Sequence, residues 1–385
     1  MQYDLTEEQK LLRDTVRRLA KEKIEPGASE RDEKAEWDWS VVDLLRENGL
    51  MGVDFPEKHG GGGAGLLAFC IAVEELSRVE ASTGLILADQ ELGALPILLA
   101  ANEQQKSQYL PKLSTGEHLA AFALTESSGG SDVAGFRCRA IKKGDEYIIN
   151  GTKTFITNGG VSDVITVYAV TDPEKGGHRG SSVFIVEKDY PGFVVGKKEN
   201  KMGIRASDTS ELIFEDCRVP AGNLLAQEGD GFGIMMKTLD FSRPGVAAQA
   251  LGIAAGALDY AVGYAKEREA FGQPIINFQG ISFKLADMAI EVEAARHLLY
   301  KTAAMFQEEP KDMSRLSKEL IRLSSMSKCL CGDVAMRVTT EAVQVLGGYG
   351  YVKEYPVERY MRDAKITQIY EGTQEIQRMV IANTL

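Results

Sequence analysis

The chain has 385 residues, of which 44% are hydrophobic and 26% are charged, and its formal net charge is −12. This composition excludes a disordered or fibrous protein, and a chain of this length is expected to form two or three packed domains. The negative charge disfavours nucleic acid as a partner, and no apolar run approaches the roughly 18 residues of a membrane span.

The first 26 residues are charged throughout and lack the apolar core of an export signal, so we expect a cytoplasmic protein. The five cysteines lack the paired spacing of a zinc site and are expected to be buried, reduced thiols. The four histidines are scattered singly along the chain. The sequence therefore predicts no metal site.

An N-terminal helical domain is predicted for residues 1–120. Residues 6–9, TEEQ, have the form of a capping box, and apolar residues follow at helical spacing as far as Pro26. Ser40 is predicted to cap a second helix, which Gly49 ends.

A β domain is predicted for residues 121–232. Short runs rich in β-branched and aromatic residues follow one another here, separated by turn signals such as Asn150-Gly151 and Pro191-Gly192. Such spacings are typical of an antiparallel sandwich or barrel.

A C-terminal four-helix bundle is predicted for residues 233–385. The segment 245–263 is small and apolar nearly all round, so we expect a buried helix with close backbone approaches. A second long helix carries a seam of residues at alternating steps of four and three. The seam consists of Ile281, Leu285, Met288, Val292, Ala295, Leu299 and Thr302. The whole chain is therefore expected to be an α+β protein with a β domain between two helical ones.

Two loops in the β domain have the composition of ligand-binding loops. AFALTESSGGSDVAGF, residues 121–136, can direct several backbone N–H groups and hydroxyls at one polar ligand. GTKTFITNGG, residues 151–160, offers Phe155 as a surface for a planar ligand. Taken singly, each loop is also explained without a ligand, the first as a surface turn and the second as a hairpin ending at Asn158-Gly159.

A helical pattern near the end of the chain contains a break. ITQIYEGTQEIQRMVI, residues 366–381, has apolar residues compatible with helix at either end, but the pattern stops at residues 370–373, where Glu371 lies. A single glutamate near a helix boundary is ordinarily a solvated or capping residue. Its meaning depends on the motifs around it.

Six motifs, taken in order, resemble the acyl-CoA dehydrogenase family of flavoproteins, and the likeness covers essentially the whole chain. The motifs are TESSGGSD (125–132), KTFITNGG (153–160), NKMGIRAS (200–207), KEREAFGQPI (266–275), AVQVLGGYGY (342–351) and YMRDAKITQIYEGT (360–373).

The resemblance implies an activity, a cofactor and partners. Members bind FAD between the β domain and the C-terminal bundle with help from a neighbouring subunit, and are usually homotetramers built as pairs of dimers. They take a proton from the α carbon and a hydride from the β carbon of an acyl-CoA, as in fatty acid metabolism. The electrons then pass to an electron-transferring flavoprotein.

The resemblance also implies roles for individual residues. Contacts to the flavin ring are expected from Phe122, Leu124, Thr125, Ser131, Phe155, Ile156 and Thr157. The adenine-nucleotide half of FAD is expected at Arg268, Phe271, Gln279, Gln344 and Gly348, with Phe278 also in the cofactor set. The last FAD contacts fall at Thr373 and Glu375. The residues on the substrate side are Ser131, Asp240, Arg243, Glu371 and Gly372.

Glu371 matches the position of the family's catalytic base. The α proton of a thioester is far less acidic than a carboxylic acid, so a base that loses its water on enclosure is a better acceptor for it. Some branches of the family carry the base on an earlier helix, at the position of Ser242. Serine cannot serve as that base, which strengthens the assignment to Glu371.

Several residues depart from the family pattern. Ser127-Ser128 replaces a usual Pro-Gly pair, Phe155 stands where many members have tryptophan, and Phe241-Ser242 replaces a commoner Gly-Gly. Asp89 and Glu91 stand where neutral, small residues are usual, in the helix that borders the acyl pocket. Either these charges turn away from the pocket, or one of them acts beyond the α carbon or orients a polar, branched or cyclic acyl group.

Two further classes of function remain open from the sequence. One keeps the fold and changes the electron route, as in acyl-CoA oxidases or enoyl-CoA reductases. The other is an FAD-free helical scaffold that only binds acyl-CoA or a protein partner.

Overall fold

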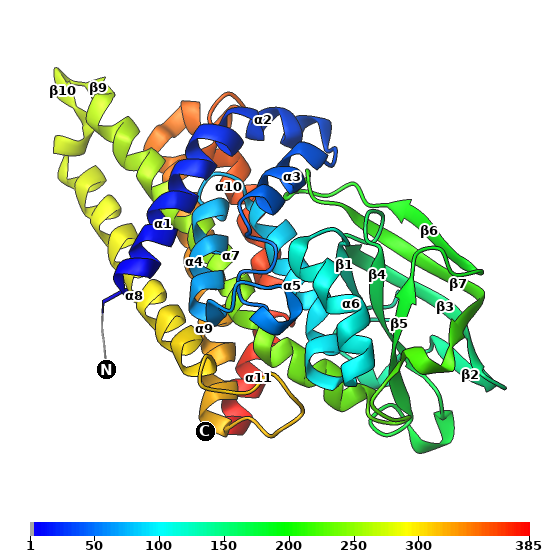
Figure 1. Cartoon of the computed structure of the whole chain (residues 1–385). Coiled ribbons are helices and arrows are strands. Elements are labelled where there is room, and N and C mark those ends of the chain that lie inside the picture. The colour runs from blue at the N-terminus through cyan, green and yellow to red at the C-terminus, as the bar shows by residue number, and fades with distance from the viewer. Residues whose placement is uncertain (1–3) are drawn as a thin grey trace.

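The computed structural model describes residues 4–385. Figure 1 shows the sheet (green) on the right, while the N-terminal helices (blue to cyan) and the long C-terminal helices (yellow to red) pack together on the left and in the centre. The N-terminal part comprises α1 (Glu7–Leu19), the π-helical turn η1 (Ala20–Ile24), α2 (Glu25–Lys34), α3 (Trp39–Glu47), α4 (Gly65–Ser77), α5 (Ala81–Ala100) and α6 (Glu103–Thr115). The sheet comprises β1 (Ala120–Ala123), β2 (Arg139–Lys143), β3 (Glu146–Thr157), β4 (Val164–Val170), β5 (Ser181–Glu187), β6 (Phe193–Lys198), β7 (Thr209–Pro220) and β8 (Leu224–Leu225). The C-terminal part comprises α7 (Gly231–Glu267), the short strands β9 (Glu269–Ala270) and β10 (Gln273–Pro274), α8 (Gln279–Phe306), α9 (Lys318–Leu346), α10 (Val357–Ala364) and α11 (Gln374–Thr384).

The first helices show how local signals set their ends. The Thr6 hydroxyl accepts a hydrogen bond from the Gln9 N–H, and the Gln9 side chain accepts one from the Thr6 N–H, which confirms the capping box. The helical path does not stop at Pro26, because this proline lies in the first turn of α2, where its missing N–H is not needed. The cap of α3 is Asp38, whose carboxylate accepts from the Ser40 N–H, so the predicted cap at Ser40 is wrong by two positions.

The sheet is mixed. Its strand order is β6-β7-β3-β2-β4-β5-β8, with β1 added against β4. Most pairs are antiparallel, as predicted, but β1 and β2 each pair with β4 in parallel, which corrects the expectation of a purely antiparallel domain. A smaller core of buried apolar side chains lies within this domain, separate from the core that joins the helices.

The strand β3 contradicts two predicted turns. Asn150-Gly151 does not turn the chain, because β3 continues through it with a bulge against β7. Glycine is required there, since a Cβ on Gly151 would lie 2.8 Å from the Cα of Cys138 and the backbone has φ +147°. Nor does a hairpin end at Asn158-Gly159, because β3 pairs with β2 and β7 and never with β4.

The C-terminal helices pack as the sequence predicts. The residues of the α8 seam from Leu285 to Thr302 are buried, and Ile281 is partly buried. Of the segment 245–263 predicted to be buried, residues 245–257 of α7 are buried throughout, against α4, α5, α8 and α9, but residues 258–263 are partly or fully exposed except for Ala261. The helix α5 lies between α7 and the strand β1, so it joins the helical core to the sheet and borders the space between them.

Two of the described helices, α5 and α7, are long and apolar enough to cross a membrane by length and composition alone. This differs from the expectation that no such run occurs. However, 94% and 78% of the apolar windows are buried inside the fold, and core helices pass the same test.

Replacing Gly256 with valine is expected to destabilise the fold by about 1–3 kcal/mol, the usual cost of overpacking. A Cβ at this position of α7 would lie 2.0 Å from the backbone oxygen of Arg78. The matched control is Gly263→Ala on the same helix, where an added Cβ meets nothing within 4 Å. This substitution should stabilise the helix by up to about 1 kcal/mol, because alanine has the higher helix propensity. Thermal unfolding of both variants tests this, and an unchanged midpoint for Gly256→Val would contradict the close packing.

Candidate active site

All three parts of the chain contribute to one cavity of about 370 Å³. Helix α5 provides Asp89, α7 provides Arg243, and the break between α10 and α11 provides Glu371. The remaining predicted residues that line it are Phe122, Leu124, Thr125, Ser131, Phe155, Ile156, Thr157 and Gly372. Segments far apart in sequence are thus brought together around Glu371.

A second cavity, of about 670 Å³, lies next to the first and shares part of its wall, including Thr125, Phe155 and Glu371. Thr373 also lines it. Phe155 is 64% exposed and has φ +60°, so a bulky aromatic ring is held open to the cavity by unfavourable backbone geometry. The Oγ1 atom of Thr209, which borders the same cavity, is buried and has no hydrogen-bond partner within residues 4–385. An apolar face and an unsatisfied hydroxyl fit a planar group with polar edges, such as a flavin.

Glu371 lies on a left-handed turn, with φ +49° at Glu371 and +94° at Gly372. This turn separates the 3₁₀ segment Lys365–Gln368 from α11, whose first residues are capped by the Thr373 side chain. The Oε2 atom of Glu371 accepts a hydrogen bond of 2.5 Å from the Ser242 hydroxyl. The break in the helical pattern therefore directs a carboxylate into the cavity.

Opposing effects act on the pKa of the Glu371 carboxyl. Burial raises the pKa of this carboxyl above its usual value. The hydrogen bond from Ser242 and the positive charges of Lys328 and Arg243 act in the opposite direction and favour the ionised form. The result is a desolvated carboxylate that is still supported as an anion.

Lys328, on α9, donates hydrogen bonds to the turn that carries Glu371. It is fully buried, and its Nζ donates to the Gly372 carbonyl at 2.7 Å and to Gln374 Oε1 at 3.3 Å. Burial lowers the pKa of Lys328 to about 8. Gln377 adds a second clamp, because its Nε2 donates to the carbonyls of Glu371 and Gly372, both at 3.0 Å. Lys328 was not predicted from the sequence, although a lysine in the buried stripe of an amphipathic helix is a visible signal.

Asp89 and Glu91 have different environments. Asp89 is 3% exposed and lines the 370 Å³ cavity, and its Oδ2 is buried with no hydrogen-bond partner in the described chain. Glu91 lines neither cavity and lies beside Lys311, whose Nζ is 3.7 Å from Glu91 Oε1 and 2.5 Å from Asp54 Oδ2. Of the alternatives open from the sequence, Asp89 faces the cavity and Glu91 turns away.

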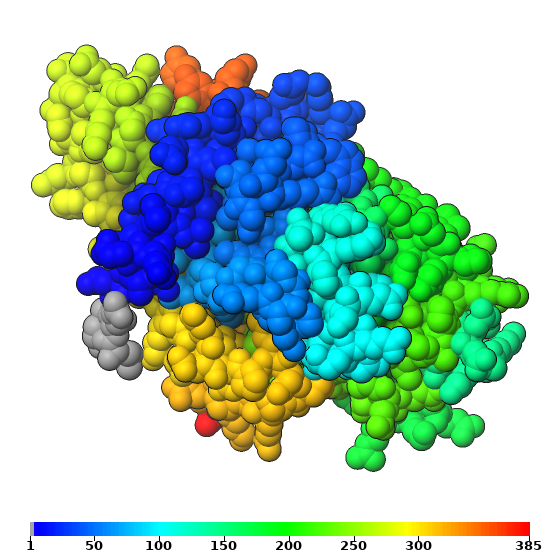
Figure 2. Space-filling model, in the orientation of Figure 1, coloured from blue at the N-terminus to red at the C-terminus, as the bar shows by residue number. Residues whose placement is uncertain are grey.

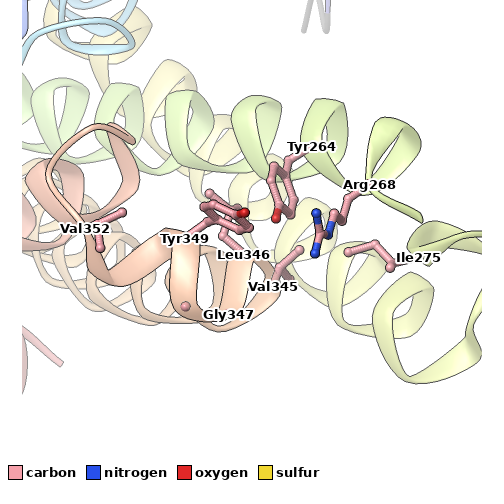
Figure 3. A pocket seen from close by; sticks show the side chains of 9 residues that line it. Tyr264, Arg268, Ile275, Val345, Leu346, Gly347, Tyr349 and Val352 are labelled. Atoms are coloured by element: carbon pink, nitrogen blue, oxygen red, sulfur yellow. The ribbon is translucent and has the colours of Figure 1, made fainter. Parts of the chain in front are cut away.

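A third pocket, of about 460 Å³, lies at the far end of α7 (Figure 3). It contains Arg268 and Gly348, and the Arg268 guanidinium lies 5.3 Å from the centre of the Tyr349 ring. None of its lining residues borders the cavities around Glu371. Within one chain the structure therefore does not bring the predicted adenine-side residues to the predicted flavin-side residues.

Six predicted site residues line none of these three cavities. Asp240 instead accepts a hydrogen bond of 2.6 Å from Arg243 Nη1, and so fixes Arg243, which lines the 370 Å³ cavity. Phe271 is 96% exposed in the turn between β9 and β10. The other four are Phe278, Gln279, Gln344 and Glu375.

Family models account for nearly the whole chain. Residues 6–117 match the N-terminal domain of acyl-CoA dehydrogenase, residues 121–217 the middle domain and residues 229–385 the C-terminal domain. The chain therefore belongs to the acyl-CoA dehydrogenase family, whose members are FAD-dependent oxidoreductases, and the resemblance, fold class and enzyme class predicted from sequence are confirmed.

Individual relatives agree with this result. The chain is 49% identical over 382 residues to an acyl-CoA dehydrogenase of Bacillus subtilis, covering 99% of this chain and 98% of the relative. It is 49% identical over 383 residues to cyclohex-1-ene-1-carbonyl-CoA dehydrogenase of Geobacter metallireducens, with coverage of 99% and 98%.

Solved structures share the fold over nearly the whole chain. Butyryl-CoA dehydrogenase from Megasphaera elsdenii has a TM-score of 0.95 and 47% identity, covering 100% of this chain and 99% of that one. A chain from the structure of the electron transferring flavoprotein of Acidaminococcus fermentans has a TM-score of 0.95 and 49% identity, with the same coverage. Glutaryl-CoA dehydrogenase from Mycobacterium smegmatis in complex with FADH2 has a TM-score of 0.90 and 30% identity, covering 98% and 94%.

Proposed function

We propose that this enzyme converts an acyl-CoA thioester to the 2-enoyl-CoA, with Glu371 as the base that removes the α proton. The observation that carries the proposal is the Glu371 carboxylate, which lies on a left-handed turn and opens into a cavity walled by the flavin-side residues. When FAD is bound there, it supplies the oxidised ring that accepts the β hydride.

The surroundings of Glu371 suit proton removal. Burial makes the carboxylate a stronger base, while Lys328, Arg243 and Ser242 keep it ionised so that it can accept a proton at all. The Gln377 and Lys328 hydrogen bonds fix the two carbonyls of the turn, so the side chain is held in place before substrate enters.

The electron acceptor in this proposal is an electron-transferring flavoprotein. It is supported by the structural similarity to a chain from the structure of the electron transferring flavoprotein of Acidaminococcus fermentans. Assaying the reduced enzyme with oxygen and with electron-transferring flavoprotein separates a dehydrogenase from an acyl-CoA oxidase.

A second candidate substrate class is a cyclic or branched acyl-CoA. The specific observation is Asp89, an unpaired carboxyl in the acyl cavity where small neutral residues would suffice for a linear chain. The 49% identity to a cyclohex-1-ene-1-carbonyl-CoA dehydrogenase points in the same direction.

An anaerobic flavin-bleaching screen over linear, branched, cyclic and dicarboxylic CoA thioesters tests both candidates. Rapid bleaching by butyryl-CoA supports the linear class, and selective bleaching by cyclic thioesters supports the second. A purified protein that contains no flavin and cannot be reconstituted with FAD would contradict the proposed function and favour a binding scaffold.

We also propose that the enzyme is a homotetramer. The turn between β9 and β10 projects from the body of the chain (upper left in Figure 2) and carries the exposed Phe271. The outer face of α8 adds the exposed Phe283 and Ile290, and such apolar groups are typical of subunit contacts. We expect a particle of about 168 kDa, four times the 42.0 kDa chain, in sedimentation or mass photometry. A 42.0 kDa particle at micromolar concentration would contradict this.

A further inference from the structure

A buried ion pair joins the two loops that are predicted to face the flavin. Lys153 of β3 is fully buried, and its Nζ lies 2.8 Å from Oε1 of Glu126, which is 7% exposed. The same Nζ donates a hydrogen bond of 2.9 Å to the backbone carbonyl of Leu124. One ammonium group on the strand therefore holds two residues of the segment that follows β1.

The Glu126 carboxylate is bound by backbone groups as well. Its Oε1 accepts from the Cys138 N–H at 2.9 Å, and its Oε2 accepts from the Arg137 N–H at 2.7 Å. Replacing a buried ion pair with well-packed apolar side chains is often neutral or even stabilising. Stability alone therefore gives little reason for two charges at this place in the fold.

The neighbours of the pair form part of the cavity wall. After Lys153 the pairing of β3 with β7 shifts, and Phe155, at φ +60°, lines both the 370 Å³ and the 670 Å³ cavity. Thr125 lines both cavities as well, and the Thr154 N–H donates to the Thr125 carbonyl at 2.9 Å. The ion pair therefore lies where the two loops meet beside the proposed flavin site.

The charge of the pair bears on the redox state of a bound flavin. Glu126 lines the 670 Å³ cavity, whereas Lys153 lines neither that cavity nor the smaller one. Without its cation, the carboxylate would place a negative charge beside the flavin, in a site with little water to screen it. Reduced flavin carries negative charge at neutral pH and oxidised flavin does not. An unbalanced charge here therefore favours one redox state over the other.

We propose that Lys153 is a positioning residue for the flavin and that its pairing with Glu126 sets the redox potential of the bound cofactor. The hydrogen bond to the Leu124 carbonyl holds the first loop against the second, so both present a fixed surface to FAD. The ion pair keeps the Glu126 charge from opposing reduction. The inference rests on the proposed function, because it takes FAD to lie between these loops.

The first test is Lys153→Met, which keeps the length of the side chain and removes its charge. We expect the affinity of the apoprotein for FAD to fall about tenfold, since a buried hydrogen-bonded charge is lost. In a redox titration against a reference dye, the ratio of reduced to oxidised FAD at a fixed potential should also fall about tenfold. For a two-electron couple this lowers the midpoint potential by about 30 mV.

The opposite charge change should move the potential the other way. Glu126→Gln keeps the shape of the side chain and leaves the Lys153 ammonium without its counter-charge, so the midpoint potential should rise by a similar amount. The double variant has neither charge, and its potential should return close to the wild-type value. A pair that only stabilised the fold would shift both single variants in the same direction or in neither.

A further variant separates charge from position. Lys153→Gln keeps a donor for the Leu124 carbonyl but carries no charge, so it should lower the potential as methionine does while retaining more FAD. It also provides the measurement if Lys153→Met does not fold. The matched control is Lys143→Met, an exposed position at the end of β2, which should change neither affinity nor potential.

The outcomes distinguish this inference from the proposed function. If the wild-type enzyme binds FAD and an acyl-CoA bleaches it, but the Lys153 and Glu126 variants keep the wild-type potential or shift it in the same direction, the inference is overturned. If the wild-type protein cannot be loaded with FAD, or no acyl-CoA bleaches the flavin, the proposed function fails instead.

Discussion

Replacing Glu371 with glutamine is expected to lower kcat for acyl-CoA dehydrogenation by about 10²- to 10⁴-fold, the range for loss of one general base. Glutamine keeps the size of the side chain and can still accept the hydrogen bond from the Ser242 hydroxyl, but it cannot take a proton. The rate of flavin reduction by an acyl-CoA, measured under anaerobic conditions by stopped flow, gives this effect directly.

The matched control is Glu354→Gln, an exposed carboxylate that precedes α10. It should leave the rate unchanged. A Glu371→Gln enzyme that is yellow, folded and reduced at the wild-type rate would show that another group removes the proton. Loss of FAD from the variant would instead show that the turn has moved.

The second large effect is expected for Lys328→Met. Methionine is apolar and similar in length, so the cavity behind the turn stays filled while the donor to the Gly372 carbonyl is lost. The turn is then held only by Gln377, and we expect kcat to fall at least about tenfold with a smaller change in KM.

The pH dependence distinguishes this role from a purely structural one. Glu371 must be ionised to act as a base, so kcat falls as the pH drops through its pKa. Lys328 lowers that pKa, and its removal raises it. The acidic limb of the kcat profile should therefore move to higher pH in Lys328→Met. Ser242→Ala should move it in the same direction, because the hydrogen bond from Ser242 also favours the anion.

The control for Lys328→Met is Lys318→Met, an exposed position in the first turn of the same helix. It should change neither kcat nor the pH profile. An unshifted profile in Lys328→Met, with reduced thermal stability, would assign Lys328 to stability alone.

Features decided by nearby residues could be predicted from the sequence. The capping box at Thr6 depends on a residue three positions away, and the α8 seam repeats within one helix, so both are readable from spacing. The parallel pairing of β1 and β2 with β4 was not predicted, because it depends on where distant strands meet. The same limit applies to Asn150-Gly151, whose turn signal is overridden by pairing with β7.

The site shows a similar division. The position of Glu371 followed from a break in the pattern and from the motif around it, and its role as base stays a prediction. The orientation of Asp89 and Glu91 could not be predicted, because α5 is buried on all sides and its periodicity does not distinguish the face toward the cavity. Lys328 was missed because its importance comes from a carbonyl 44 residues away in sequence.

The length of α7 relates cofactor binding to the proposed tetramer. Between Arg243 and Glu267 the helix advances roughly 36 Å, at 1.5 Å per residue, and the Arg268 pocket shares no lining residue with the Glu371 cavity. A single FAD that meets both the Arg268 pocket and the Glu371 cavity therefore needs two chains. In the proposed tetramer, FAD binding and subunit association would stabilise each other by mass action. Extensive dilution should then release FAD and dissociate the subunits together, and adding FAD should restore the assembled yellow form.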